Sequence, residues 1–185
     1  MHKLIVSSAT YRQGSRANPK AQDVDAGNVY LWRRAPMRLE AESIRDSILA
    51  VSGALNPLAG GPGYRDFKMY NHKGSWVYDP IDPEGPEFNR RSIYRTWARG
   101  NVHPLLSPLD CPDPSSAAPV RSVTTTPLGA LSLMNTSFVI RMSEQMAKRL
   151  EVEKDDDQKR IAHAFELAFG RSATPQDLNL GLGFV

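Results

Sequence analysis

Apolar residues recur at intervals of three and four along two long stretches of this chain, the spacing that places side chains on one face of an α-helix. In the first stretch, Pro36 suits the first helical position. Arg38, Glu42 and Arg45 fall on the side away from the apolar residues, where their charges can pair. The pattern therefore predicts an amphipathic helix over residues 37–52. Its apolar stripe consists of Met37, Ala41, Ile44, Ile48, Val51 and Leu55.

The second stretch is longer and also begins at a proline. Thr126 can accept free N–H groups of a first helical turn, and Pro127 presets the φ angle there. The apolar stripe then continues over six turns, which predicts one helix over residues 127–150. Further helices are predicted over residues 157–169 and from Pro175 onward, and the three long helices are expected to pack together. The stripe consists of Leu128, Leu131, Met134, Phe138, Met142, Met146 and Leu150.

The middle of the chain has a different character. Ten of the fourteen prolines and six of the thirteen glycines lie between residues 56 and 119, so loops are expected there. Two short aromatic-rich runs within residues 64–79 flank the polar tetrapeptide at residues 71–74, and they predict a small hairpin with a four-residue loop. Residues 91–97 are rich in strand formers and fit either a third strand or a helical turn.

Together these patterns favour a mainly α fold, a helical bundle with a small β-hairpin and long ordered proline-rich loops. A length of 185 residues fits a single domain. At its start, residues 1–10 can form a short helix with Leu4 and Ile5 facing inward. Three regions are expected along this domain: N-terminal helices over 1–55, a loop and hairpin region over 56–125, and C-terminal helices over 126–185.

Charge and cysteine content exclude several classes of function. Residues 1–100 carry 15 basic and 10 acidic side chains, a net charge of +5, whereas residues 101–185 carry 8 and 10, a net charge of −2. There is no long lysine or arginine run and no interleaving of aromatic with basic residues, so no nucleic-acid partner is expected. Cys111 is the single cysteine, which excludes a disulfide within the chain and a metal site built from several thiolates.

The apolar runs of the chain are short. None approaches the roughly 18 residues that a membrane-spanning helix needs, so no membrane insertion is expected. The run that follows Met1-His2-Lys3 has only three apolar residues, too few for the core of a signal peptide. No motif for a cofactor or a metal ion is recognised, and neither is expected to be bound.

The segment from Asn89 to Phe138 changes character four times, as segments shaped around a site or a docking surface do. It passes from arginines and a tryptophan to a proline-bracketed acidic loop and then to a helix that starts at a proline. The forked donors of arginine suit carboxylate, sulfate or phosphate groups, aromatic faces suit sugar rings, and a histidine suits acid–base work. The binding candidates are Arg90, Arg91, Arg95, Trp97, His103, Asp110 and Asp113.

Each candidate also has a structural alternative. The arginines can pair with the acidic residues between positions 79 and 87 and so hold an irregular region together. Asp110 and Asp113 can bind a hard cation or act as acid and base, or they can accept backbone N–H bonds in a turn. Their negative charge is expected to raise the pKa of the Cys111 thiol between them, which makes it unreactive. No residue is assigned a catalytic role.

Six motifs, taken in order, resemble one protein family. They are HKLIVSSATYRQ at 2–13, RLEAESIRD at 38–46, GGP at 60–62, NRRSIY at 89–94, VTTTPL at 123–128, and AF followed by GR and TP between 164 and 175. The chain is similar over nearly its whole length to the planctomycete-specific C-terminal domain of unknown function 1553. This resemblance implies the C-terminal part of a larger exported protein that also carries a cytochrome-c-like module. It supplies no catalytic residues.

Two functions stay open from the sequence. The first is a structural or interaction module that docks against the remainder of its parent polypeptide or a cytochrome-c-like module. The second is part of an envelope enzyme or binding protein that acts on polysaccharide or another anionic polymer. The lack of a known catalytic motif favours the first function. The cluster of arginine, aromatic and acidic residues favours the second, as does the cell-envelope location that the resemblance implies.

Overall fold

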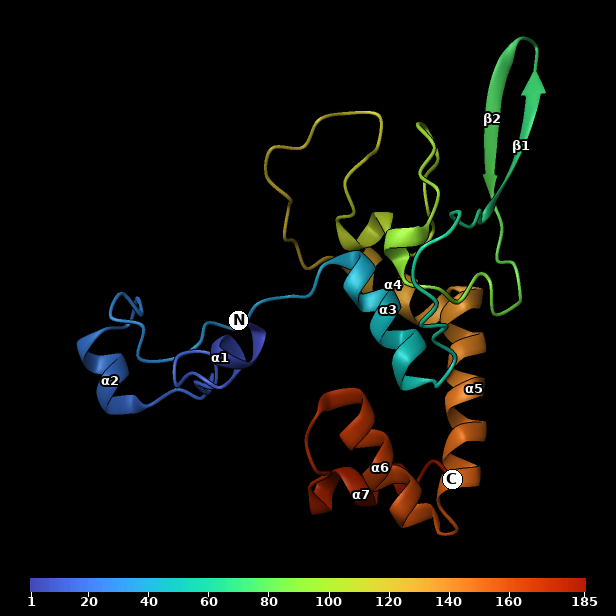
Figure 1. The fold of residues 1–185 in the computed structure, drawn as a ribbon. Coiled ribbons are helices and arrows are strands. Elements are labelled where there is room, and N and C mark those ends of the chain that lie inside the picture. Colours follow the sequence, from blue (N-terminus) through green and yellow to red (C-terminus); the bar gives the residue numbers. More distant parts are fainter. The chain divides into compact units, whose positions relative to one another are not determined.

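The computed structural model describes residues 1–185, which form two compact units, Met1–Arg38 and Leu39–Val185. Helices and 3-10 turns account for 41% of the chain, so the protein is helix-rich with one hairpin, and "mainly α" applies only modestly (Figure 1). The elements of the larger unit are α3 (Ala41–Val51), β1 (Phe67–His72), β2 (Ser75–Pro80), the 3-10 turns Ser92–Tyr94 and Ser107–Leu109, α4 (Pro127–Asn135), α5 (Ser137–Glu153), α6 (Asp157–Phe169) and α7 (Pro175–Leu182).

The smaller unit contains two short helices, α1 (His2–Val6) and α2 (Pro19–Val24), and neither buries a side chain. Leu4 and Ile5 are 71% and 49% exposed, so the expectation that they face inward is wrong. A helix of five residues makes little more than one turn and is too short to cover a core. Hydrogen bonds hold this unit instead, such as those from the backbone of residues 29 and 30 to the Asp25 carboxylate.

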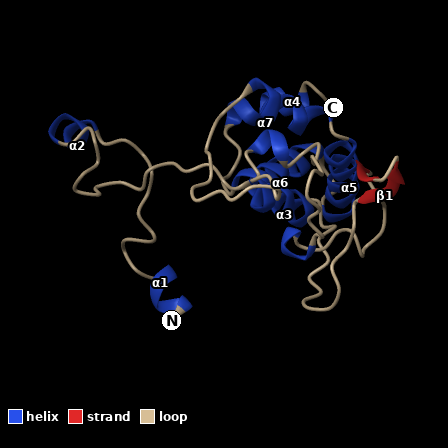
Figure 2. Ribbon diagram, turned by 90° about the horizontal axis from the view of Figure 1, so that it is seen from above, coloured by secondary structure: helices blue, strands red, loops and turns tan.

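Helix α5 is central to the helical packing of the larger unit, where it contacts α3, α4 and α6, while α7 packs against α6 (Figure 2). The C-terminal part of the second predicted long helix, α5, therefore packs against both the first and the third. Helix α6 spans the residues predicted for it, because Asp156 caps its first turn and Gly170 ends it with a φ of 62°. Helix α3 begins at Ala41 rather than at Met37, which is exposed.

The helix predicted over residues 127–150 is two helices that meet at Thr136. This residue has extended backbone angles, and its hydroxyl donates to the carbonyl of Ser132 at 2.8 Å. Short polar side chains that bond to nearby backbone groups compete with continuous helix, which accounts for the break. The predicted stripe is consequently not one buried face, because Met142 is buried while Leu128, Leu131 and Met134 on α4 are exposed.

The main apolar core lies between α3 and the loop that contains the second 3-10 turn. Its buried members are Ala41, Leu105, Leu106 and Leu109. The partly buried residues packed around it are Ile44, Cys111, Leu133, Phe138 and Val139. A proline-rich loop thus supplies three of the four central side chains. This arrangement has no helical or strand period that a sequence reader can detect.

The hairpin is present, but its loop is shorter than predicted. His72 pairs with Ser75, so the turn consists of Lys73 and Gly74 alone, with φ angles of 50° and 87°. Positive φ at both positions is typical of the tight turn whose twist matches that of the two strands. Phe67, at the base of the hairpin, is its one buried residue, and the strands extend away from the helices of this unit (Figure 1).

Arg45 is the clearest difference between expectation and structure in α3. Sequence spacing predicts a surface position, yet the residue is 5% exposed. Its guanidinium donates to the carbonyls of Phe88 and Arg90, and the neighbouring Asp46 accepts bonds from the backbone N–H and hydroxyl of Ser92. These bonds fasten α3 to the segment at 88–92. Within residues 91–97, for which the sequence fits a third strand or a helical turn, Ser92–Tyr94 form a 3-10 turn, the second of these alternatives.

Candidate functional site

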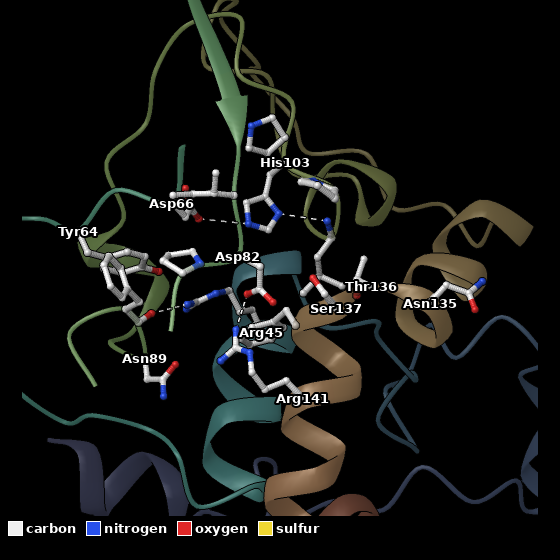
Figure 3. A pocket seen from close by; sticks show the side chains of 17 residues that line it. Arg45, Tyr64, Asp66, Asp82, Asn89, His103, Asn135, Thr136, Ser137 and Arg141 are labelled. Carbon is white, nitrogen blue, oxygen red and sulfur yellow. Dashed lines mark hydrogen bonds and ion pairs between the residues drawn. The ribbon is translucent and has the colours of Figure 1, made fainter. Parts of the chain in front are cut away.

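The larger unit contains a cleft of about 350 Å³ whose walls come from segments far apart in the sequence (Figure 3). Tyr64 and Asp66 precede β1, Pro80 ends β2, and residues 81–83 follow it. Residues 88–89 and 103–105 are loops, Arg45 belongs to α3, and residues 135–141 form the junction of α4 with α5. The cleft therefore exists only because the hairpin base, two loops and three helices converge.

A buried ion pair forms the floor of this region. The Nε atom of Arg95 donates to both carboxylate oxygens of Asp66, at 2.9 and 2.7 Å, and both side chains are almost fully buried. Burial alone would raise the pKa of Asp66. Hydrogen bonds from His103 and Arg95 outweigh that effect and hold the pKa below its ordinary value. Asp66 is consequently an ionised acceptor in the folded protein.

His103 has both ring nitrogens engaged. Its Nδ1 accepts from the backbone N–H groups of Leu105 and Leu106, each at 3.1 Å. The ring proton therefore sits on Nε2, which lies 3.3 Å from a carboxylate oxygen of Asp66. The imidazole links the Asp66 carboxylate to the turn that carries the core leucines.

Aromatic rings and arginines stack along one wall. The Arg45 guanidinium lies 5.3 Å from the ring centre of Tyr64 and 5.2 Å from that of Phe138. Phe88 packs edge-on against Tyr64 at 6.4 Å. Tyr64 is 6% exposed, and its hydroxyl has no hydrogen-bond partner. Burial raises the pKa of this phenol to about 12, so it is a protonated donor at neutral pH.

The start of α5 forms another part of the cleft wall. Thr136, Ser137 and Phe138 line the cleft, and Arg141, one turn further on, pairs with Asp82 after β2. Thr136 occupies the cap position, but no side chain caps this helix and no acidic residue lies in its first turn. Asn135 points away from the other labelled side chains (Figure 3).

Three of the candidates predicted from sequence come together here. Arg95 and His103 both contact Asp66, and the Arg95 guanidinium lies 4.5 Å from the ring centre of Trp97. Of these three candidates only His103 lines the cleft, and Arg95 and Trp97 lie behind it. Trp97 stacks on the outer side of the ion pair.

Arg90 makes contacts that differ from those of the other candidate arginines. Its guanidinium donates to the carbonyls of Leu58, Gly60 and Pro62 and lies 4.1 Å from the ring centre of Tyr94. Arg90 is buried, and it holds the glycine-rich loop rather than facing the cleft.

Arg91, the next residue, has an exposed side chain and lies 3.5 Å from Asp46. The two adjacent arginines thus differ in surroundings. One is an internal clamp, and the other lies at the surface in a weak ion pair.

The acidic loop lies along another part of the unit. Asp110 has a left-handed backbone with a φ of 61°, and its carboxylate accepts from the N–H and hydroxyl of Thr124, just before α4. Asp113 accepts from the backbone N–H of Ser115 in a turn. No group of three or more His, Cys, Asp or Glu side chains is placed to hold a metal ion.

Cys111 lies between these two aspartates and packs against the core. Burial, followed by the charge of Glu42, raises the pKa of its thiol to about 11. Glu42 in turn accepts two bonds from Arg121, at 2.8 and 3.0 Å. A thiol with this pKa is protonated at neutral pH and is a poor nucleophile.

Sequence reasoning missed four residues of the cleft: Tyr64, Asp66, Arg45 and Arg141. Asp66 carried a usable signal, since it is an acidic residue directly before an aromatic-rich strand, where a charge needs a partner. Tyr64 and Arg141 carry no such signal, because their roles depend on which loops meet.

None of the helices is both long and apolar enough to cross a membrane.

Comparison with known families gives one match. The family described as "Protein of unknown function (DUF1553)" matches residues 1–185, the whole chain. No curated protein and no solved structure matches it.

Proposed function

We propose that this chain, which belongs to the DUF1553 family, is a non-catalytic interaction module of a larger protein. The groups best suited to acid–base chemistry have internal partners. Asp66 is bound by Arg95 and His103, and both nitrogens of His103 are engaged. Cys111 has a raised pKa. Groups fixed in this way stabilise a structure, whereas a general base must reach the proton of a substrate.

The observation that carries this proposal is the outer face of α4. Leu128, Leu131 and Met134 are 63%, 52% and 71% exposed, and their spacing of three places them on one side of the helix. The inner side of α4, at Gly129 and Ser132, is buried. Contiguous exposed apolar surface on a folded unit is typical of a contact with another protein. The proposed partner is the remainder of the parent polypeptide, in particular a cytochrome-c-like module.

Calorimetry with that module, produced separately, tests the proposal. Leu131→Asp should weaken binding at least tenfold, because a charge is placed within an apolar contact. Val152→Asp, at an exposed position of α5, is the matched control and should bind as the wild type does. Both variants should have the melting temperature of the wild type. Equal affinity of the two variants would show that α4 is not the docking face.

A second candidate function is the binding of polysaccharide or another anionic polymer, and the cleft favours it. Aromatic rings line the cleft beside Arg45 and Arg141, and the buried hydroxyl of Tyr64 has no partner within the protein. Pockets of this kind, mostly apolar with a few convergent polar groups, are typical ligand sites. Affinity electrophoresis in gels containing polygalacturonate, a sulfated glycan or neutral dextran tests it. Retardation in the anionic gels alone is the expected result.

A further inference from the structure

We propose that the cleft binds an oxyanion at the first turn of α5, and that the anion is the carboxylate or sulfate group of a sugar ring. The inference rests on the second candidate function and names the chemistry that the cleft recognises. Two independent features of the structure carry it, an uncapped helix start and a buried donor without a partner.

The first feature is the start of α5. A helix leaves its first N–H groups without intrahelical acceptors, and the helix dipole adds partial positive charge there. A side chain often supplies the missing acceptor, as Thr126 does for α4 and Asp156 for α6. Here the hydroxyl of Thr136 donates to Ser132 instead, and no acidic residue lies in the first turn. Ser137 and Phe138 border the cleft, so a negatively charged ligand group in it would meet these N–H groups.

The second feature is the hydroxyl of Tyr64. Buried polar groups are nearly always hydrogen-bonded, and this one lies in the cleft wall with no partner. In Figure 3, Arg45 and Asp82 lie between Tyr64 and Ser137. The residues that line the cleft therefore include both an unpartnered hydroxyl donor and the first residues of α5.

The cleft is lined by as many basic as acidic side chains, namely Arg45, Arg141, Asp66 and Asp82. An anionic ligand therefore needs a basic group that can change its partner. Beyond Arg45, Asp46 lies 3.8 Å away and is itself contacted by Arg91. Asp82 occupies Arg141 in the free protein, and an arriving oxyanion would compete with it for that guanidinium.

Size and lining favour one sugar ring. A volume of about 350 Å³ is near the lower end for small-molecule pockets, which suits one ring rather than a folded segment of protein. The rings of Tyr64, Phe88 and Phe138 offer flat apolar faces, while Arg45 and Asp82 offer polar atoms. A ring with an apolar face, hydroxyl groups and one charged substituent matches this division.

Calorimetric titration with glucuronate, glucose 6-sulfate and glucose tests the ligand class. Glucuronate, glucose 6-sulfate or both should bind at least tenfold more tightly than glucose, and the tighter of the two identifies the anion. Equal binding of all three would overturn the anion proposal. A different result is that the anionic polymers retard the protein in gels while the variants described next leave sugar binding unchanged. In that case the protein binds the polymer, but the proposed site in the cleft is wrong.

Tyr64→Phe separates a binding role from a structural one. It should weaken binding of the preferred sugar about tenfold, since it removes one bond to a charged group, and should keep the melting temperature or raise it. Tyr94→Phe is the matched control, because the Tyr94 hydroxyl accepts from the Gly60 N–H at 2.9 Å. It should melt earlier and bind normally.

Asp82→Asn provides the opposite test. Removing the carboxylate that competes for Arg141 should strengthen binding of the anionic sugar. Unchanged affinity in both Tyr64→Phe and Asp82→Asn would show that the anion binds elsewhere.

Discussion

Two ion pairs in the larger unit use the same chemical groups in opposite surroundings. Asp66 is buried with Arg95 and His103, whereas Asp177 pairs with Arg171 at the partly exposed start of α7. Bonds from Arg171 and Thr174 lower the pKa of Asp177 to about 2, and the pKa of Asp66 is also lowered, against the effect of burial. A low carboxyl pKa therefore does not show which of the two pairs contributes more to stability. Burial does, because only inside the protein does the loss of a partner leave a charge that water cannot reach.

The sharpest test of this comparison removes each carboxylate in turn. Asp66→Ala should lower the free energy of unfolding by about 3–5 kcal/mol, because the Arg95 guanidinium stays buried without its partner. Asp177→Ala should change stability far less, since water replaces the lost interaction. Urea denaturation followed by circular dichroism measures both. Equal losses would contradict the distinction, and recovery of stability in a variant carrying Asp66→Ala and Arg95→Leu would support it.

The pH dependence of stability should also reveal the contribution of the pair between Asp66 and Arg95. A carboxyl group whose pKa is lowered on folding stabilises the protein above its unfolded pKa of about 3.9, and this contribution is lost as pH falls through the lower folded value. Stability of the wild type should therefore fall steeply below about pH 4. Asp66→Asn should start less stable at pH 7 and show a shallower slope between pH 4 and 2. A parallel slope in melting temperature against pH would show that other carboxyl groups dominate.

The two adjacent arginines repeat the comparison at a second place. Arg90→Lys should cost about 2 kcal/mol, because an ammonium group cannot serve three carbonyls at once. Arg91→Lys should stay within about 0.5 kcal/mol of the wild type, since that side chain is exposed. Thermal melting of both variants suffices. A large effect at position 91 would mean that its ion pair with Asp46 matters more than its exposure indicates.

The acidic loop should give the smallest effects. Asp110→Asn keeps an acceptor for Thr124 and tolerates a left-handed backbone, so it should cost a few tenths of a kcal/mol. Asp110→Ala loses the acceptor and strains the backbone, and it should cost about 1–2 kcal/mol. Differential scanning calorimetry resolves this order. Wild-type stability in both variants, combined with lost binding of an anionic sugar, would make Asp110 a ligand-binding residue.

The fold was predictable where a local signal matched the local structure. Both ends of α6 follow from Asp156 and Gly170, which act within a single turn. The break at Thr136 was not predictable, because the apolar spacing continues through it and the deciding bond runs back to α4. The core leucines at 105, 106 and 109 lack a period altogether, since a 3-10 turn between prolines presents them.

The site residues were likewise predictable only where they lie close together in the sequence. Arg95 and His103 lie eight residues apart and were found together, but their shared partner, Asp66, comes from the base of the hairpin. No pattern in a single sequence states which loops meet. The structure also relates two motifs that the sequence only places in order, because Arg90 of NRRSIY donates to Gly60 and Pro62 of GGP.

The exposed hairpin has a practical consequence. Its base matters to the cleft, since Pro80 lines the wall and Phe67 packs edge-on against Tyr78 at 5.6 Å. No other part of the chain packs on its tip, because an atom added at Gly74 would meet nothing within 4 Å, although the φ of 87° at this position favours glycine. Exposed turns of this kind tolerate added residues. A short epitope or a fluorescent label inserted at this turn, with Gly74 retained, would therefore mark the molecule away from the cleft and leave the wall at Pro80 unaltered.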